Sequence, residues 1–202
     1  MSDRQLIIII GREHGSHGHE IAAKLAEELG VDLYDKEILN DLAEHFELDH
    51  EYIAQYDEKP RNQLIHKISG RPSVPIEDVL AQKVFRYERH LAASGKSFVI
   101  VGRCADDVLK DNQNIVNVFI CADLDYRVRQ IMERNGLSEE DARKEIKKVD
   151  HDRRLYHDNY AEKNWNDTDS YDLVINSAKL GPEKSVQVIK SYIAIQRSSE
   201  FE

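Results

Sequence analysis

An uninterrupted run of five aliphatic residues, Leu6–Ile10, is the feature that most constrains the fold of this chain. A strand with one wet face alternates apolar and polar residues, whereas a continuous apolar run is typical of a strand buried on both faces. A glycine-containing stretch follows at once, and then a helical period with Ile21, Leu25 and Leu29 at four-residue spacing. This order predicts an α/β fold with a mainly parallel sheet covered by helices on both faces.

The rest of the chain repeats the alternation of short apolar runs and helical periods. Further strands are predicted at residues 31–34, 98–101, 116–120 and 173–175. Helices are predicted after Asp35, over about 49–56, from Ile76 to Gly95, after Asp123, after Ser138 and around Pro182. Serine at 138 caps a helix start, because its hydroxyl accepts a hydrogen bond from a first-turn amide.

The composition excludes several classes of function. The formal net charge is −10, so bulk electrostatic binding to nucleic acid or to anionic lipid is not expected. No apolar run approaches the length of a membrane span, and no apolar signal region follows the charged N-terminus. Two cysteines are too few for a disulfide framework. We expect one cytoplasmic domain of 202 residues, with neither a nucleic-acid nor a membrane partner.

The loop from Gly11 to Glu20 lies between a buried strand and a helix, where parallel-sheet proteins bind phosphate. Gly11, Gly15 and Gly18 let the backbone wrap around an anion. The loop nevertheless departs from the Walker A pattern, because it contains no lysine and lacks a hydroxyl at the Mg²⁺ position. On the loop alone, phosphate binding and an ordinary strand–helix turn are equally open.

A set of motifs in a particular order carries a resemblance to a known family. They are the loop above and the stretches 99–106, 118–120, 127–134 and 171–176. In combination they resemble the cytidylate kinase-like family, a branch of the P-loop nucleoside monophosphate kinases, over residues 6–193. The resemblance implies a five-stranded parallel sheet in the order 2-3-1-4-5 with flanking helices. It also implies a single P-loop kinase-like domain over 1–202, with an acceptor-side flap at 57–95 and a lid at 127–160.

The function implied is transfer of a phosphoryl group from ATP to a nucleoside monophosphate, with CMP as the leading acceptor and Mg²⁺ as cofactor. The implied donor-phosphate ligands are Gly11, Gly15, Ser16, His17, Gly18, His19 and Glu20. The implied acceptor ligands are Asp35, Arg103, Asp106 and Asp150. The expected catalytic arginines are Arg12, Arg127, Arg153 and Arg154. A homodimer is left open.

The charge pattern agrees with a lid that contacts phosphates. Residues 127–154 carry a net charge of +2, which leaves −12 on the rest of the chain. A locally basic segment in an acidic chain is what a polyphosphate site needs, and the arginine fork pairs with phosphate oxygens bidentately. The alternative is a solvated amphipathic helix with charges of both signs.

Three positions depart from the family pattern. Gly18 stands in place of the Walker lysine, Glu20 in place of the Mg²⁺-binding hydroxyl, and Val101 in place of the acid in an Asp-Gly-Arg motif. One hypothesis is that Arg12 supplies the missing cation. Another is that Mg²⁺ is bound by Glu13, Glu20 or Asp106. The departures also favour two alternatives: a nucleotide-binding protein without turnover, and a kinase of another small metabolite.

Three histidines also distinguish the loop. The family is expected to carry an aromatic, a glycine and a basic residue near positions 14, 17 and 19, whereas this chain has His14, His17 and His19. Protonated imidazoles would strengthen anion binding below neutral pH. A transition-metal site built from the three rings is the rival interpretation, and three exposed polar side chains are the third.

Overall fold

The computed structural model describes residues 4–35, 76–102 and 104–198. Several predictions fall elsewhere in the chain: the helices after Asp35 and over 49–56, the insertion at 57–75, and Arg103. These lie outside the described residues.

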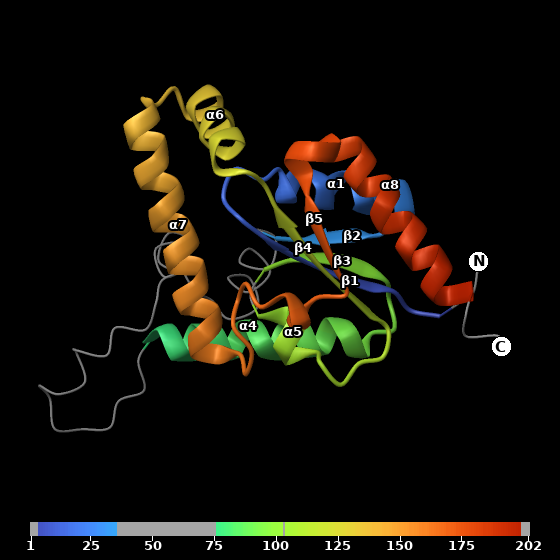
Figure 1. Ribbon diagram of the computed structural model, residues 1–202. Helices are drawn as coiled ribbons and strands as arrows, with labels where there is room; N and C mark the ends of the chain where they lie inside the picture. The colour runs from blue at the N-terminus through green and yellow to red at the C-terminus, as the bar shows by residue number, and fades with distance from the viewer. Residues whose placement is uncertain (1–3, 36–75, 103, 199–202) are drawn as a thin grey trace, which may run out of the picture.

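A five-stranded parallel sheet in the order β2-β3-β1-β4-β5 forms the centre of the molecule (Figure 1). Its strands are β1 (Ile7–Arg12), β2 (Asp32–Tyr34), β3 (Phe98–Val101), β4 (Ile115–Cys121) and β5 (Leu173–Asn176). The predicted fold class and strand order are therefore confirmed. Strand β1 extends beyond the aliphatic run, because Gly11 and Arg12 still pair with Phe119 and Ile120 of β4.

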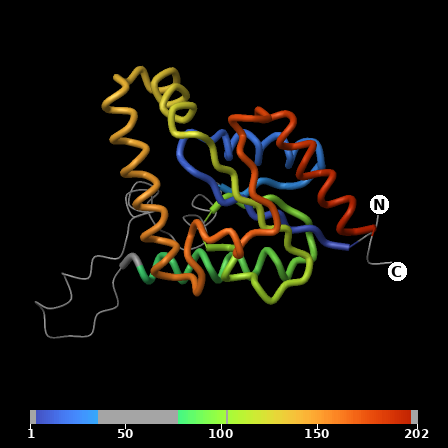
Figure 2. Tube along the Cα trace, in the orientation of Figure 1, coloured from blue at the N-terminus to red at the C-terminus, as the bar shows by residue number. Residues whose placement is uncertain are grey.

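The two faces of β1 explain the aliphatic run. Ile8 and Ile10 belong to a core shared with helices α1 (Gly18–Leu29) and α8 (Ser177–Ser198). Ile7 and Ile9 belong to a second core, shared with α4 (Ile76–Ala93) and α5 (Ala105–Val108). Successive side chains of a strand point to opposite faces, so burial on both faces requires every residue to be apolar. Figure 2 shows α1 and α8 side by side over one face.

The final helix has a break near its start. Gly181 has φ 72° and ψ 170°, which is not helical, and Pro182 begins the longer segment that follows. Proline suits a first helical turn, because its missing amide would have no intrahelical acceptor there. The last helix is thus present around Pro182, as predicted, but it begins earlier, at Ser177, and is broken at Gly181.

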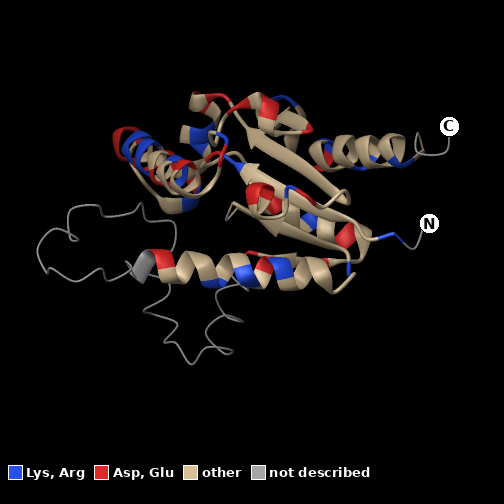
Figure 3. Cartoon of the chain, turned by 90° about the horizontal axis from the view of Figure 1, so that it is seen from below, with Lys and Arg blue, Asp and Glu red and all other residues tan. Residues whose placement is uncertain are grey.

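Helices α6 (Leu124–Asn135) and α7 (Glu139–Tyr160) form a pair beyond the carboxyl end of the sheet (Figure 1). They share a small core of Val128, Ile131, Ala142 and Ile146. Ser138 caps α7 by accepting a hydrogen bond from the Asp141 amide at 3.2 Å, as predicted. Charged residues lie mainly on helices and loops, and the strands carry few (Figure 3). None of the helices in the described ranges is long and apolar enough to cross a membrane.

Candidate functional site

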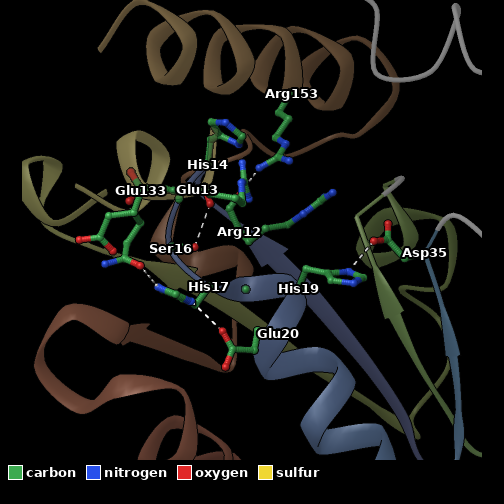
Figure 4. Close-up of a pocket in the computed structure, with 14 residues that line it drawn as sticks. Arg12, Glu13, His14, Ser16, His17, His19, Glu20, Asp35, Glu133 and Arg153 are labelled. Atoms are coloured by element: carbon green, nitrogen blue, oxygen red, sulfur yellow. Dashed lines mark hydrogen bonds and ion pairs between the residues drawn. The ribbon is translucent and has the colours of Figure 1, made fainter. Parts of the chain in front are cut away.

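A cavity of about 660 Å³ opens at the carboxyl end of β1 (Figure 4). Its size falls in the range of small-molecule sites. The phosphate loop, the end of β2, α6 and α7 all contribute to its wall. The lining residues are Arg12, Glu13, His14, Gly15, Ser16, His17, Gly18, His19, Glu20, Asp35, Gln130, Glu133, Arg134 and Arg153.

The loop backbone is shaped around the start of α1. His17, the residue before the helix, has φ 60°, a left-handed conformation that glycine adopts more readily. The first amides of α1 have no acceptors within the helix and carry its positive end. Ser16 is fully buried, and its hydroxyl donates to the Glu13 carbonyl at 2.8 Å. Ser177 fixes the same turn by donating its hydroxyl to the Ser16 carbonyl at 2.7 Å.

An ion-pair network supports the loop from behind. The Arg127 Nη1 atom lies 2.6 Å from Asp150 Oδ2, and both side chains are nearly buried. Asp150 also accepts a hydrogen bond from the His14 amide at 2.7 Å, and Glu13 accepts one from the Ala122 amide at 3.0 Å. Burial raises the pKa of Glu13, while the Ala122 amide and Arg127 oppose that rise. Arg127 and Asp150 do not line the cavity, so the structure places these two predicted site residues under the loop.

The three histidines contact different partners and do not converge. The His14 Nε2 atom lies 2.7 Å from Glu145 of α7, and His19 Nδ1 lies 2.6 Å from Asp35. The two ring nitrogens of His17 lie 2.8 Å from Glu20 and 2.8 Å from Gln130. Burial lowers the pKa of His14, and the bond to Glu145 opposes this. Within residues 4–35, 76–102 and 104–198, no three metal-ligating side chains form a group.

Arg12 and Arg153 line both the large cavity and a second, smaller one. Arg153 of α7 donates a hydrogen bond from Nη1 to the Arg12 carbonyl at 3.2 Å. The smaller cavity has a volume of about 30 Å³ and lies on the other side of β1. Its remaining lining residues are Ile9, Gly11, Gly102, Cys104, Asp106, Asn117, Tyr156, His157, Trp165 and Tyr171. Arg154 is exposed and lines neither cavity.

The second cavity holds the predicted acceptor ligand Asp106. Its carboxylate lies 2.8 Å from His157 Nε2, and both side chains are nearly buried. Burial of His157 acts to lower its pKa, but the hydrogen bond and charge of Asp106 outweigh that effect and raise the pKa. Asp106 is thus separated from Asp35, which lines the larger cavity. Val101, at the position of the missing acid, is fully buried in the sheet.

Three polar residues of the large cavity were not predicted individually as site residues, although they lie in the predicted lid: Gln130, Glu133 and Arg134 of α6. The sequence did contain one indication of their position. Val128 and Ile131 mark the apolar face of the helix, so these three residues lie on its other faces. That spacing does not say which neighbour the polar faces meet.

A buried acid was also missed. Glu88 of α4 is fully buried, and neither of its carboxylate oxygens has a hydrogen-bond partner in the part of the chain that the structure describes. Burial, and then the charge of Asp106, raise its pKa well above the ordinary value, against a smaller opposing effect of Arg89. The helical period of α4 put position 88 on the same face as Val84 and Leu91, and this was the signal available.

Comparisons with known proteins agree with this architecture. A family model described as "Cytidylate kinase-like family" matches residues 7–179. The crystal structure of an uncharacterized protein from Eubacterium ventriosum is 34% identical, with a TM-score of 0.75, and the match covers 94% of this chain and 99% of that one. No curated protein matches the chain.

Shikimate kinases share the fold at low identity. The enzyme from Bacteroides thetaiotaomicron is 14% identical, with a TM-score of 0.57 over 94% of this chain and 98% of that one. The enzyme from Acinetobacter baumannii, solved in complex with shikimate, is 12% identical, with a TM-score of 0.55 over 96% and 94% of the two chains. At these identities the likeness concerns the fold alone.

Proposed function

Because the chain belongs to the cytidylate kinase-like family, we propose that it transfers the γ-phosphoryl group of ATP to a nucleoside monophosphate, with CMP as the leading acceptor. The family and the shared kinase fold support a nucleotide or small-molecule kinase. The choice of CMP as the acceptor is our proposal and follows from the family resemblance.

The observation that carries the proposal is the arrangement of cations around this cavity. The phosphate loop with Arg12 forms one wall, and Arg153 reaches the same space from α7 (Figure 4). Arg134 of α6 also lines the cavity. Phosphoryl transfer needs in-line positioning and positive charge around the equatorial oxygens, with little covalent chemistry from the protein. Arginines from opposite walls provide the positive charge. They also position the phosphates, because their guanidinium groups pair with phosphate oxygens bidentately.

The donor triphosphate is proposed to bind at the start of α1. The backbone amides of Gly15, His17 and Gly18, together with the positive end of the helix, favour the β- and γ-phosphates there. The acceptor is proposed to bind toward Asp35, with Arg103 on its phosphate. A nucleoside monophosphate presents an oxygen that is already anionic, so no general base is required.

The residues of the cavity fit Mg²⁺ in the form that kinases use. Mg²⁺ is usually held by one or two carboxylates, the substrate phosphates and water, so a cage of three protein ligands is not needed. Glu20 lines the cavity in the first turn of α1, and its side chain is 44% exposed. All three candidate carboxylates have partners: Glu13 contacts Ala122 and Arg127, Asp106 contacts His157, and Glu20 contacts His17 and Lys24. Glu20 fits best because it lines the large cavity and is the most exposed of the three. When bound, the ion would neutralise charge on the β- and γ-phosphates.

Segment 127–160 is proposed to act as a lid-like cover of the donor phosphates within a single domain of 1–202. Its two helices carry Gln130, Glu133, Arg134 and Arg153 into the cavity wall. Exclusion of water by such a cover strengthens the electrostatic interactions of the phosphates.

The test is transfer from labelled ATP with Mg²⁺ to CMP, dCMP, UMP, AMP, GMP and no acceptor. We expect labelled CDP, and we expect Arg153→Ala to lower the rate by about 100-fold or more. Lys184→Ala removes one positive charge from an exposed position of α8 and serves as the matched control. Product that persists at the wild-type level in Arg153→Ala would come from a contaminating kinase and would count against the proposal.

A second candidate function is nucleotide binding without turnover. The residues that favour it are Gly18, Glu20 and Val101, each in place of a group that stabilises transition-state charge. Saturable binding of ATP with no product from any acceptor would select this alternative. Saturable ATP binding and a product from a non-nucleotide acceptor would instead select the kinase of another small metabolite.

A further inference from the structure

Two glycines that are far apart in the sequence define the path of the Arg12 side chain. A Cβ atom on Gly18 would lie 2.4 Å from the Arg12 Cβ and 2.9 Å from its Cγ. A Cβ atom on Gly102 would lie 2.2 Å from the Arg12 Nη1. Each of these distances is below 3.0 Å, a limit that real Cβ atoms essentially never cross. The stem of Arg12 therefore starts against α1, and its guanidinium lies against the residue that follows β3.

The first of these contacts explains the glycine at the position of the missing lysine. Gly18 stands where the family resemblance places the Walker lysine. The volume that the start of a lysine side chain would enter there is filled by Arg12 Cβ and Cγ. A lysine at 18 and Arg12 in this conformation therefore exclude each other. The loss of the lysine and the path of Arg12 are two aspects of one arrangement, and the loop retains a cation.

The second contact places the positive charge of Arg12 beside Gly102, beyond the phosphate loop itself. Arg12 and Arg153 are the two residues of the described ranges that line both cavities. Arg12 is anchored at its carbonyl by Arg153 Nη1 at 3.2 Å. The stem of Arg12 thus lies at the start of α1, where donor phosphates bind in P-loop proteins, and its guanidinium lies beside Gly102 at the end of β3.

We propose that Arg12 replaces the phosphate-loop lysine and contacts the phosphoryl group in transit, with one edge of its guanidinium toward the donor and the other toward the acceptor. This inference rests on the proposed function. A phosphoryl group between two oxygens carries charge on its three equatorial oxygens, and a planar fork can bind two of them. The arrangement selects acceptors that present an anionic oxygen beside Gly102, such as a monophosphate.

An exchange of the cation between the two positions provides the sharpest test. The variants are Arg12→Ala, Arg12→Lys, Gly18→Lys and the double variant Arg12→Ala/Gly18→Lys, with Lys184→Ala as the charge control. We expect Arg12→Ala to lower the transfer rate by about 100-fold or more. Arg12→Lys should retain part of the rate, because an ammonium group supplies charge without the fork.

The double variant should transfer faster than either single variant by about tenfold or more, since it restores a cation and removes the steric conflict. Gly18→Lys alone should be slow, because its side chain meets Arg12. A thermal melt of each variant identifies loss of folding. If Gly18→Lys does not fold, the comparison between Arg12→Ala and the double variant still decides the question.

Two results would overturn the inference. One is an Arg12→Ala rate within about threefold of the wild type. The other is a folded double variant that is no faster than Arg12→Ala.

A binding measurement separates this inference from the proposed function. Inorganic tripolyphosphate is the probe, titrated into the wild type and Arg12→Ala by calorimetry. If the wild type transfers to no acceptor, the proposed function fails, and a tenfold or greater loss of tripolyphosphate affinity in Arg12→Ala would still support Arg12 as the loop cation. Equal affinities, or no binding by the wild type, would overturn it.

Discussion

Asp150 of α7 and Arg127 of α6 form an ion pair of 2.6 Å directly behind the phosphate loop. The same carboxylate accepts a hydrogen bond from the His14 amide, and the Arg127 guanidinium donates to the His14 carbonyl at 3.3 Å. The pair therefore fixes the peptide groups on both sides of one loop residue. Two residues that the family resemblance assigns to substrate contact support the loop backbone in this structure.

Asp150→Ala should destabilise the protein strongly, because it leaves the nearly buried Arg127 guanidinium with only the longer 3.4 Å contact to the Glu13 carboxylate. Breaking a buried pair in this way costs about 3–5 kcal/mol. Urea unfolding measures the effect. The control is Glu140→Ala, which removes an exposed ion pair with Lys144 on the same helix and should cost less than about 1 kcal/mol. Equal losses in the two variants would contradict a supporting role for Asp150.

His17→Val should be less stable than His17→Asn. Both substitutions remove the contacts of the imidazole with Glu20 and Gln130, so the two variants differ mainly in backbone preference. At φ 60°, asparagine is tolerated, whereas a β-branched residue is strained by about 1–2 kcal/mol. The difference between their free energies of unfolding checks this, and equal values would contradict it.

Glu88→Gln should make stability less dependent on pH. The unfolded carboxyl loses its proton near its ordinary pKa of 4.5, while the folded one, with a raised pKa, keeps it. The folded state then binds more protons, so wild-type stability falls as pH rises above 4.5 and levels off above the raised pKa. A neutral amide removes this fall.

Urea midpoints of the wild type and Glu88→Gln, measured between about pH 4 and pH 8, should therefore diverge as pH increases. Glu27→Gln, at an exposed position of α1, is the control and should follow the wild type at every pH. Parallel curves for Glu88→Gln and the wild type would show that Glu88 ionises normally in the folded protein.

Gly102→Ala should impair transfer more than Gly95→Ala. The two glycines have φ 78° and φ 75°, so alanine is strained to a similar extent at both positions. Of these two, Gly102 alone would place its new Cβ against Arg12, since no atom of the described residues lies within 4 Å of a Cβ at Gly95. Similar stabilities with a lower transfer rate in Gly102→Ala alone would support the path of Arg12, and equal rates would contradict it.

The fold could be predicted well because its determinants are local. Continuous apolar runs identified the strands, and caps such as Ser138 identified helix starts. The family resemblance supplied the strand order. The contacts of Arg127 could not be predicted from such local patterns. Its position on a basic helix suggested a phosphate ligand, but its guanidinium is directed to Asp150, Glu13 and the loop backbone.

The arrangement of the candidate site depends on contacts between distant segments. Asp106 and Asp35 both follow strand ends, yet they line different cavities. Glu133 and Arg134 enter the wall through the packing of α6 on α7. No spacing within one helix contains that information.

The contact between position 18 and Arg12 also restricts how such a loop can evolve. A loop with a lysine at 18 cannot gain Arg12 in this conformation by one substitution, and this loop cannot regain the lysine by one. Each route passes either through a sequence with no loop cation or through one with two side chains in the same volume. The pair is therefore expected to be inherited together, and descendants that lose one residue should seldom survive without losing or replacing the other.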